Sequence, residues 1–216
     1  MPETLLAPLD VRDLGRMPYA DAWALQKRLL EAIGEGTSPE TLLLVEHDPV
    51  ITLGRKAGAD ANVLDAGAMP VLAIERGGDA TYHGPGQLVG YPLIRLTDGE
   101  RDLHRYLRNL EELVIRTLAD FGLEGRREPG LTGVWVEGRK LASLGVAVRK
   151  WVTYHGLALN VSCDLGGFAR LNPCGLESQV MASMATFLGR EVPLAEVKAR
   201  LLAHVPDTLG RLPREA

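Results

Sequence analysis

Of the residues that could do covalent chemistry, the two cysteines differ most in what their surroundings allow. Cys174 lies in the turn-rich run 171–176, just before a predicted helix. Backbone N–H groups at a helix start favour a thiolate and can stabilise an oxyanion, so Cys174 is a candidate nucleophile. A turn cysteine with no chemical task is the alternative. Cys163 shares its strand side with the apolar residues of 157–161, which predicts a buried, inert thiol.

Lys140 carries an amine that could work beside such a thiol. In the strand predicted over 141–148, Lys140 has the same parity as Leu144 and Val146, so its side chain is expected on the apolar side. A partly desolvated lysine gives up its proton more easily and can act as a base near neutral pH. The alternative is a lysine whose amine reaches water from the hairpin tip.

A glycine-rich segment, residues 76–87, could let the backbone approach a ligand closely. The side chains of Thr81, Tyr82 and His83 would bring polar groups beside that ligand. The segment lacks the ending of a phosphate-binding P-loop, and its glycines do not have the spacing of a dinucleotide-binding motif. A glycine-rich connection between strands, with His83 in a structural hydrogen bond, is the alternative.

The histidines leave a second chemistry open. His83 or His155, paired with Cys174, would suit a Cys/His hydrolase, although each histidine alone is more typical of a structural role. The histidines without an assigned role are His47, His104 and His204. Neither cysteine lies in an array with the spacing of a zinc site, so we expect no metal and no cofactor.

Apolar periodicity and turn residues predict the elements that must position these side chains. The predicted helices cover 18–33, 98–122, 177–188 and 193–202. The predicted strands cover 41–46, 50–53, 71–75, 88–94, 132–136, 141–148 and 152–161. We expect the first two strands to form a hairpin and the last three an antiparallel meander. The side chains expected on the wet face of the second helix are Arg105, Arg108, Glu111 and Glu112.

This order of elements predicts an α+β fold in which helices flank a largely antiparallel or mixed β-sheet, with one domain over residues 1–216. The chain has 46% hydrophobic and 24% charged residues, which argues against disorder. Its net charge of −4 argues against nucleic acid as a partner. No apolar run has the length of a membrane span and the N-terminus is unlike a signal peptide, so we expect a cytoplasmic protein with no membrane partner.

Four segments carry a family resemblance, and they are Arg76-Gly-Gly-Asp-Ala-Thr-Tyr-His-Gly-Pro-Gly-Gln87, Gly138-Arg-Lys-Leu-Ala-Ser-Leu-Gly145, His155-Gly-Leu-Ala-Leu-Asn160 and Asn172-Pro-Cys-Gly175. In this order they resemble the octanoyl-[acyl-carrier-protein]:protein N-octanoyltransferases, the lipoyl (octanoyl) transferases of lipoate biosynthesis. The resemblance runs from about Leu42 to about Gly189. One departure is Val180-Met-Ala-Ser-Met184, where relatives more often read like Val-Thr-Ser-Leu.

The resemblance implies the biotin/lipoate protein ligase catalytic fold and acyl transfer without ATP. It places Cys174 where the family has its acyl-thioester nucleophile, and Lys140 where the family has the lysine that helps this cysteine lose its proton. The residues that it places on substrate-binding segments are Arg76, Gly77, Gly78, Asp79, Ala80, Thr81, Tyr82, His83, Ser143, Leu144, Gly145, Gly156, Leu157 and Ala158.

The implied partners are acyl carrier protein, which donates octanoyl from its phosphopantetheine, and acceptor lipoyl domains. Those acceptors are the E2 subunits of 2-oxoacid dehydrogenases and the glycine-cleavage H protein. Because carrier proteins are acidic, we expect a basic rim near the site. Its expected members are Arg55, Lys56, Arg76, Arg139, Arg149 and Lys150. The competing hypotheses are an ATP-dependent lipoate ligase, an octanoyl amidotransferase, a Cys/His hydrolase and a non-catalytic docking module.

Overall fold

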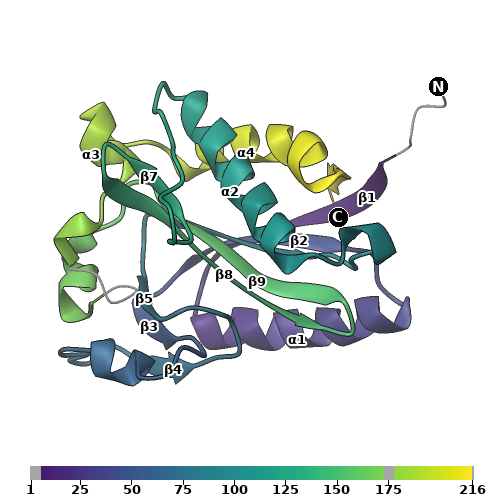
Figure 1. Cartoon of the computed structure of the whole chain (residues 1–216), viewed down its shortest axis with the longest axis horizontal. Coiled ribbons are helices and arrows are strands. Elements are labelled where there is room, and N and C mark those ends of the chain that lie inside the picture. Colours follow the sequence, from purple (N-terminus) through teal and green to yellow (C-terminus); the bar gives the residue numbers. More distant parts are fainter. Residues whose placement is uncertain (1–5, 173–177, 216) are drawn as a thin grey trace.

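The computed structural model describes residues 6–172 and 178–215, and a seven-stranded sheet forms its centre (Figure 1). The order across this sheet is β10-β1-β2-β6-β9-β8-β7. Its strands are β1 (Ala7–Met17), β2 (Thr41–His47), β6 (Gln87–Leu93), β7 (Val134–Val136), β8 (Arg139–Arg149), β9 (Val152–Asn160) and β10 (Arg211–Glu215). Strand β1 is parallel to β2 and β10, whereas the other neighbours are antiparallel. The sheet is therefore mixed, as the sequence predicts.

A second, three-stranded sheet has the order β4-β3-β5. Its members are β3 (Val50–Leu53), β4 (Val71–Ala73) and β5 (Ala80–His83). The hairpin predicted from 41–46 and 50–53 is wrong, because β2 and β3 belong to different sheets. The chain passes from one sheet to the other through Asp48 and Pro49, and β3 pairs instead with β4 and β5.

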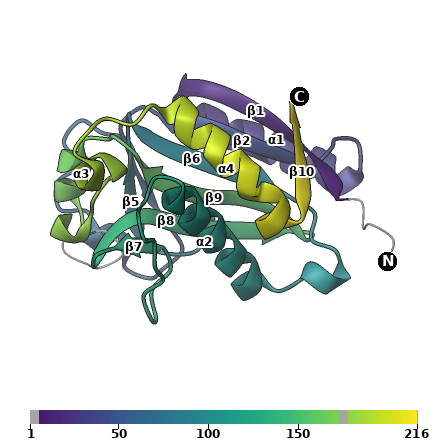
Figure 2. The same cartoon turned by 90° about the horizontal axis from the view of Figure 1, so that it is seen from above.

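Helices cover both faces of the large sheet. Helix α1 (Tyr19–Glu35) packs on one face, and α2 (Leu103–Ala119) lies beside α4 (Leu194–Leu209) on the other (Figures 1 and 2). The short helices are η1 (Ala59–Asn62), η2 (Asp98–Glu100), η3 (Leu165–Arg170), η5 (Ser178–Val180) and α3 (Met184–Leu188). Within the described ranges, no helix combines the length and apolar character needed to cross a membrane.

Strand β2 shows how one sheet serves two cores. Leu42 and Leu44 face the cluster under α2 and α4, whereas Leu43 and Val45 face the cluster under α1. Successive side chains of a strand point to opposite faces, so a strand covered on both sides reads as a continuous apolar run. The run 41–46 in the sequence has this origin.

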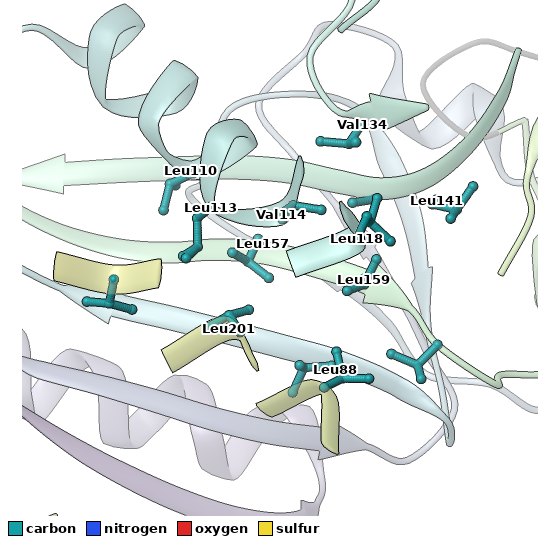
Figure 3. Packing of buried hydrophobic residues seen from close by; sticks show 14 of the residues in the cluster. Leu88, Leu110, Leu113, Val114, Leu118, Val134, Leu141, Leu157, Leu159 and Leu201 are labelled. Carbon is teal, nitrogen blue, oxygen red and sulfur yellow. The ribbon is translucent and has the colours of Figure 1, made fainter. Parts of the chain in front are cut away.

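Helix α2 packs through apolar side chains spaced by three or four residues. The packed residues labelled in Figure 3 include Leu110, Leu113, Val114 and Leu118 of α2, Leu157 and Leu159 of β9 and Leu201 of α4. Burial of each such leucine stabilises the fold by roughly 1.5–3 kcal/mol relative to exposure. The helix begins after Asp102, whose carboxylate accepts a hydrogen bond from the backbone N–H of Arg105.

Several predicted boundaries differ from the structure. Thr97 caps the short η2 rather than α2, so the helix predicted from residue 98 begins at Leu103. Of the helix predicted over 177–188, the described part forms η5 and α3. Helix α4 continues to Leu209, past the predicted end at 202, because Val205 and Leu209 are buried in the core. The elements that the sequence does not predict are the strands β1, β5 and β10 and the short helices η1 and η3.

Helix α1, the other strands and the meander formed by β7, β8 and β9 confirm their predictions. One side chain of the predicted wet face is wrong: Glu111 is 0% exposed. Arg127 and Gly133, from the segment after α2, cover its carboxylate.

Candidate active site

The substrate-binding segments predicted from the sequence meet at two cavities. The first, called the His83 cavity, lies where β5 and the loop before it face the middle of β8 and β9. Its lining residues are Tyr19, Arg76, Gly78, Asp79, Thr81, His83, Val89, Tyr91, Ser143, Leu144, Gly145, His155, Gly156, Leu157 and Ala158. Segments from 76–83, 143–145 and 156–158 thus converge, although up to 82 positions separate their residues (158 − 76).

The second cavity, called the Lys140 cavity, has a volume of about 230 Å³. Its lining residues are Lys56, Gly77, Gly78, Asp79, Leu107, Gly130, Leu131, Thr132, Lys140, Leu144, Gly145 and Val146. Gly78, Asp79, Leu144 and Gly145 line both cavities, so the two adjoin along these residues.

Two predicted substrate-binding residues, Ala80 and Tyr82, point away from both cavities. They belong to the small core under the three-stranded sheet, where the Tyr82 ring packs edge-on against Phe168. Their neighbours Thr81 and His83 line the His83 cavity. The alternation of side chains along β5 explains this division.

Glycines let the segments approach one another. Gly145 of β8 pairs with Gly156 of β9. A Cβ atom on Gly145 would lie 2.8 Å from the Gly77 carbonyl oxygen, and one on Gly156 would lie 2.2 Å from the Gly90 carbonyl oxygen. Any larger residue would therefore push the backbone apart at the cavity.

Arg76 brings a positive charge to the His83 cavity. It is only 8% exposed, and its guanidinium donates to the carbonyl and hydroxyl oxygens of Thr52, both at 3.0 Å, and to the Gly77 carbonyl oxygen at 3.1 Å. Its predicted place on an exposed rim is wrong, because the side chain is buried within the site.

Two hydroxyl groups of the cavity lining have no hydrogen-bond partner among the described residues. They are the Oγ1 atom of Thr81 and the Oγ atom of Ser143, both buried. Buried polar atoms normally find a partner, so these hydroxyls can bind a polar group of a ligand.

Three histidines and two tyrosines form a buried cluster at the same cavity. The His83 ring stacks on Tyr19 with centroids 5.5 Å apart, and His47 contacts both Tyr19 and Tyr91. The sequence pattern gives His47 no role, yet its side chain is fully buried. Its strand parity, shared with Leu43 and Val45, was the signal that could have revealed this position.

Hydrogen bonds fix the proton positions on two of these rings. Nδ1 of His47 donates to the Met17 carbonyl oxygen at 3.1 Å, so its Nε2 accepts from the Tyr91 hydroxyl at 2.8 Å. Nδ1 of His83 donates to Oε1 of Gln87 at 2.7 Å, because the Gln87 amide nitrogen donates to Asn160. Nε2 of His83 faces the Thr52 hydroxyl at 3.4 Å. Both nitrogens of His83 thus face groups of the protein itself.

Burial lowers the pKa of each histidine in the cluster. The pKa is about 4 for His47, about 3 for His83 and about 4 for His155, and desolvation of the charged form is the largest cause in each. Arg76 also disfavours the charged form of His83 and His155. The rings are therefore neutral at pH 7.

Because of this histidine cluster, we expect acid to lower the free energy of unfolding at pH values above those at which carboxylates titrate. Because the folded-state pKa values lie below the ordinary 6.5, the unfolded chain binds more protons as pH falls below about 6.5. The stabilising contribution is complete above that pH. We expect the free energy of unfolding to fall between pH 6.5 and pH 5 by up to about 1.4 kcal/mol per pH unit for each histidine.

Urea unfolding at pH 7.5, 6.5, 5.8 and 5.0 measures this slope. His47→Gln should remove about a third of it, whereas His104→Gln, which changes an exposed histidine, should leave it unchanged. A free energy of unfolding that stays constant from pH 7.5 to 5 would contradict the prediction.

Lys140 lies where the Lys140 cavity meets the large sheet. Its side chain is only 2% exposed, and its Nζ lies 5.0 Å from the centroid of the Trp135 ring. The predicted position on the apolar side of the strand is confirmed, since Leu144 and Val146 line the same cavity.

Cys174, the predicted nucleophile, lies outside the described residues, as do the other members of 173–177. The described residues on either side of 173–177 are hydrogen-bonded to residues that line the Lys140 cavity or contact its lining. The Asn172 backbone N–H donates to the Asn62 carbonyl oxygen at 2.8 Å, and the Asn62 side chain donates to Asp79 at 2.7 Å. On the other side, the Ala182 backbone N–H donates to the Lys140 carbonyl oxygen at 3.0 Å.

Residues 181–183 lie in the stretch where the sequence departs from the family pattern. Hydrogen bonds fix all three of them. The Met181 carbonyl oxygen accepts from Arg139 at 2.8 Å, and the Ala182 carbonyl oxygen accepts from Asn160 at 2.9 Å. Ser183 caps α3 by accepting from the Thr186 backbone N–H. The packing of this helix is therefore defined despite the departure.

Cys163 is the buried thiol that the sequence predicts, with 7% of its surface exposed. Burial, followed by the charge of Asp164, raises the pKa of this thiol to about 12. It therefore stays protonated at neutral pH and is a poor nucleophile.

The expected basic rim is present only in part. Lys56 is exposed and pairs with the buried carboxylate of Asp79 at 2.7 Å, and Arg149 pairs with Glu31 at 2.7 Å. Burial tends to raise the pKa of Asp79, but Lys56 and two further hydrogen bonds hold it below the ordinary value. Arg55 and Lys150 are exposed, and Arg139 is partly buried.

Comparison with known proteins adds the family context. Residues 18–206 match the model of the lipoyl protein ligase A/B catalytic domain. An octanoyltransferase of Geobacter metallireducens is 53% identical over 94% of this chain and 95% of its own length. An octanoyltransferase of Rubrobacter xylanophilus is 52% identical with the same coverage.

Solved structures with the same fold have much lower sequence identity. A lipoate-protein ligase A bound with ATP aligns with a TM-score of 0.76 at 20% identity, over 98% of this chain and 89% of that one. A biotin protein ligase from Aquifex aeolicus, in complex with biotin and ATP, aligns with a TM-score of 0.60 at 15% identity, over 93% and 70%. These likenesses confirm the predicted catalytic fold.

Proposed function

We propose that this chain, which belongs to the lipoyl protein ligase A/B catalytic-domain family, transfers its acyl group through a thioester on Cys174, with Lys140 as proton acceptor. The chain is an acyltransferase that moves octanoyl groups in protein lipoylation. The acceptor is a lipoyl domain. We further propose that octanoyl-acyl carrier protein is the donor. The proposed acceptors are the E2 subunits of 2-oxoacid dehydrogenases and the glycine-cleavage H protein.

The proposed reaction has two steps. The Cys174 thiol gives its proton to Lys140, and the thiolate attacks the carbonyl carbon of the donor thioester. The phosphopantetheine sulfur leaves and takes this proton from Lys140, which is neutral again for the second step. The neutral amine of an acceptor lysine then attacks the new thioester, and the Cys174 sulfur leaves. Each step exchanges one acyl bond for another, and the final amide is more stable than a thioester, so no ATP is consumed.

The observation that carries the proposal is the placement of Lys140. A buried amine at a cavity is able to receive the thiol proton in the first step and the ammonium proton of the acceptor in the second. Its carbonyl oxygen is hydrogen-bonded to Ala182, and Asn172 reaches Asp79 of the same cavity through Asn62. These two anchors, on either side of 173–177, support the proposal that Cys174 and Lys140 act together.

The His83 cavity is the proposed binding site of the octanoyl chain. Its apolar lining comes from Val89, Leu144, Leu157 and Ala158, and each buried CH₂ contributes about 0.8 kcal/mol. The hydroxyls of Thr81 and Ser143, which have no partner among the described residues, are available for the thioester carbonyl oxygen. The exposed cations Arg55, Lys56 and Lys150 are the proposed contacts for an acidic carrier protein.

Incubation with octanoyl carrier protein in the absence of ATP tests the proposal. Intact mass should show one octanoyl group on the protein, released by neutral hydroxylamine as a thioester is. Addition of a lipoyl domain should then move the group to the domain as a hydroxylamine-resistant amide. An adduct that needs octanoate and ATP would contradict the proposal in favour of a ligase.

The other competing hypotheses give different products in the same assay. Free octanoate as the main product in the presence of acceptor would indicate a hydrolase. A preference for octanoylated lipoyl domain over carrier protein as donor would indicate an amidotransferase. Binding of carrier protein with no thioester would indicate a docking module.

A further inference from the structure

We propose that Glu111 is a positioning residue for Lys140, because its carboxylate holds the backbone at Gly133 against the Lys140 side chain. The inference rests on the proposed role of Lys140 in proton transfer. It concerns a residue of α2 outside the segments of the family resemblance, whose side chain the helical pattern places in water.

The carboxylate of Glu111 divides its two oxygens between different partners. Oε1 accepts a hydrogen bond from the Gly133 backbone N–H at 3.0 Å. Oε2 accepts from Nη1 of Arg108 at 2.6 Å and from Nε of Arg127 at 3.1 Å. The arginines offset the cost of burying the charge, so the other oxygen is left to hold the backbone.

Gly133 in turn lies directly against the lysine. Its φ is 144°, a conformation that favours glycine. A Cβ atom at this position would lie 2.7 Å from Cε of Lys140 and 2.6 Å from the Ala142 carbonyl oxygen. The backbone of Gly133 therefore confines the end of the Lys140 side chain from one side, and the Trp135 ring lies near the amine.

The same hydrogen bond holds part of the cavity wall. Gly130, Leu131 and Thr132, which precede Gly133, line the Lys140 cavity with Lys140 itself. If the Gly133 N–H loses its acceptor, this wall is free to move and the amine loses its fixed position. A displacement of about 1 Å at a reacting group can lower a rate by about a hundredfold.

Glu112, the next residue of α2, also pairs with two arginines, but it is not buried. Its carboxylate pairs with Arg116 at 3.1 Å and Arg127 at 2.8 Å while remaining partly exposed. Among the residues that the structure describes, its carboxylate accepts hydrogen bonds from these two arginines and not from Gly133. Glu112 is thus a matched control, with similar charge pairs and no hold on Gly133.

Two variants of Glu111 separate the hydrogen bond from the charge. Glu111→Gln keeps a side-chain oxygen of the same reach for the Gly133 N–H but removes the charge. Its NH₂ group then faces Arg108 and Arg127, which are exposed enough to turn to water, and Arg127 keeps its pair with Glu112. Glu111→Asp keeps the charge, but its side chain is one CH₂ shorter and cannot reach the Gly133 N–H. Both arginines are partly exposed, so their side chains can move to keep their ion pairs with the shorter carboxylate. We expect kcat to fall about tenfold or more in Glu111→Asp, with KM for octanoyl carrier protein within about twofold.

The other two variants should keep their activity. Glu111→Gln should keep kcat within about threefold of wild type, and Glu112→Asp should be unchanged. A larger loss in Glu111→Gln than in Glu111→Asp, equal activity of all variants, or a change in KM alone would each overturn the inference. Thermal melts of all three variants establish that the compared proteins are folded.

A second measurement needs no acyl donor. The rate at which acetic anhydride modifies Lys140, followed by peptide mass spectrometry, reports access to the amine. It should rise severalfold in Glu111→Asp and stay unchanged in Glu112→Asp, and an unchanged rate in Glu111→Asp would overturn the inference. Lys140→Met run in the transfer assay separates the two proposals, since wild-type activity in that variant refutes the proposed role of Lys140 whatever the labelling shows.

Discussion

Cys174→Ala is expected to lower octanoyl transfer by at least about a thousandfold, the scale of losses seen when a covalent nucleophile is removed. The variant has no sulfur to accept the acyl group, so the hydroxylamine-sensitive adduct should disappear altogether. Intact mass after incubation with octanoyl carrier protein, and the rate of lipoyl-domain octanoylation, measure the two effects. An adduct that persists in Cys174→Ala would refute the assigned nucleophile.

The second cysteine provides the matched control. Cys163→Ala should form the adduct at the wild-type rate, because the Cys163 thiol is buried and its pKa is raised to about 12. Iodoacetamide at pH 7.5 should label Cys174 and leave Cys163 unmodified in the folded protein. Rapid labelling of both thiols would indicate that the environment of Cys163 is open.

The sequence was sufficient where the side-chain period of one element decides the outcome. The parity of strand residues correctly predicted that Lys140 shares a side with Leu144 and Val146, and that Cys163 is buried. The meander of β7, β8 and β9 followed from short turns between β-prone runs. These features depend on residues that are close in the chain, so local patterns carry them.

Features that depend on distant segments were missed. Strand β5 lies in the glycine-rich segment that reads as a turn, and it forms because it pairs with β3, about thirty positions earlier (83 − 50 = 33). Tyr19, His47 and His83 come together from three separate elements. Periodicity assigns each side chain to a face of its own element but does not say which element covers that face.

Glu111 is the clearest case of such non-local burial. Along α2 it belongs with polar residues, and the helical pattern alone predicts that it is exposed. A later segment brings Arg127 and Gly133 over it and makes its carboxylate part of the interior. A polar residue at the border of an apolar face can therefore be buried when another segment offers both charge and backbone donors.

The second large effect is expected for Lys140→Met. The methionine side chain is similar in length and suits a buried site, so the fold should remain stable while the amine is lost. Thioester formation at pH 7 should slow by about a hundredfold or more, the usual contribution of a positioned base. Lys198→Met, which removes a lysine that pairs with Asp13 at 2.8 Å and lines neither the His83 cavity nor the Lys140 cavity, serves as the control and should keep the wild-type rate.

The pH dependence of this variant gives the sharper test. Without the amine, the Cys174 thiol must lose its proton to solvent, and an ordinary cysteine does so with a pKa near 8.5. The rate of Lys140→Met should therefore rise as pH increases from 7 to 9, so that its deficit against wild type narrows. Lys140→Arg should remain slow at pH 7, because a guanidinium keeps its proton and cannot act as a base. A deficit that is constant from pH 7 to 9 would show that Lys140 acts on the reaction in some way other than by accepting the thiol proton.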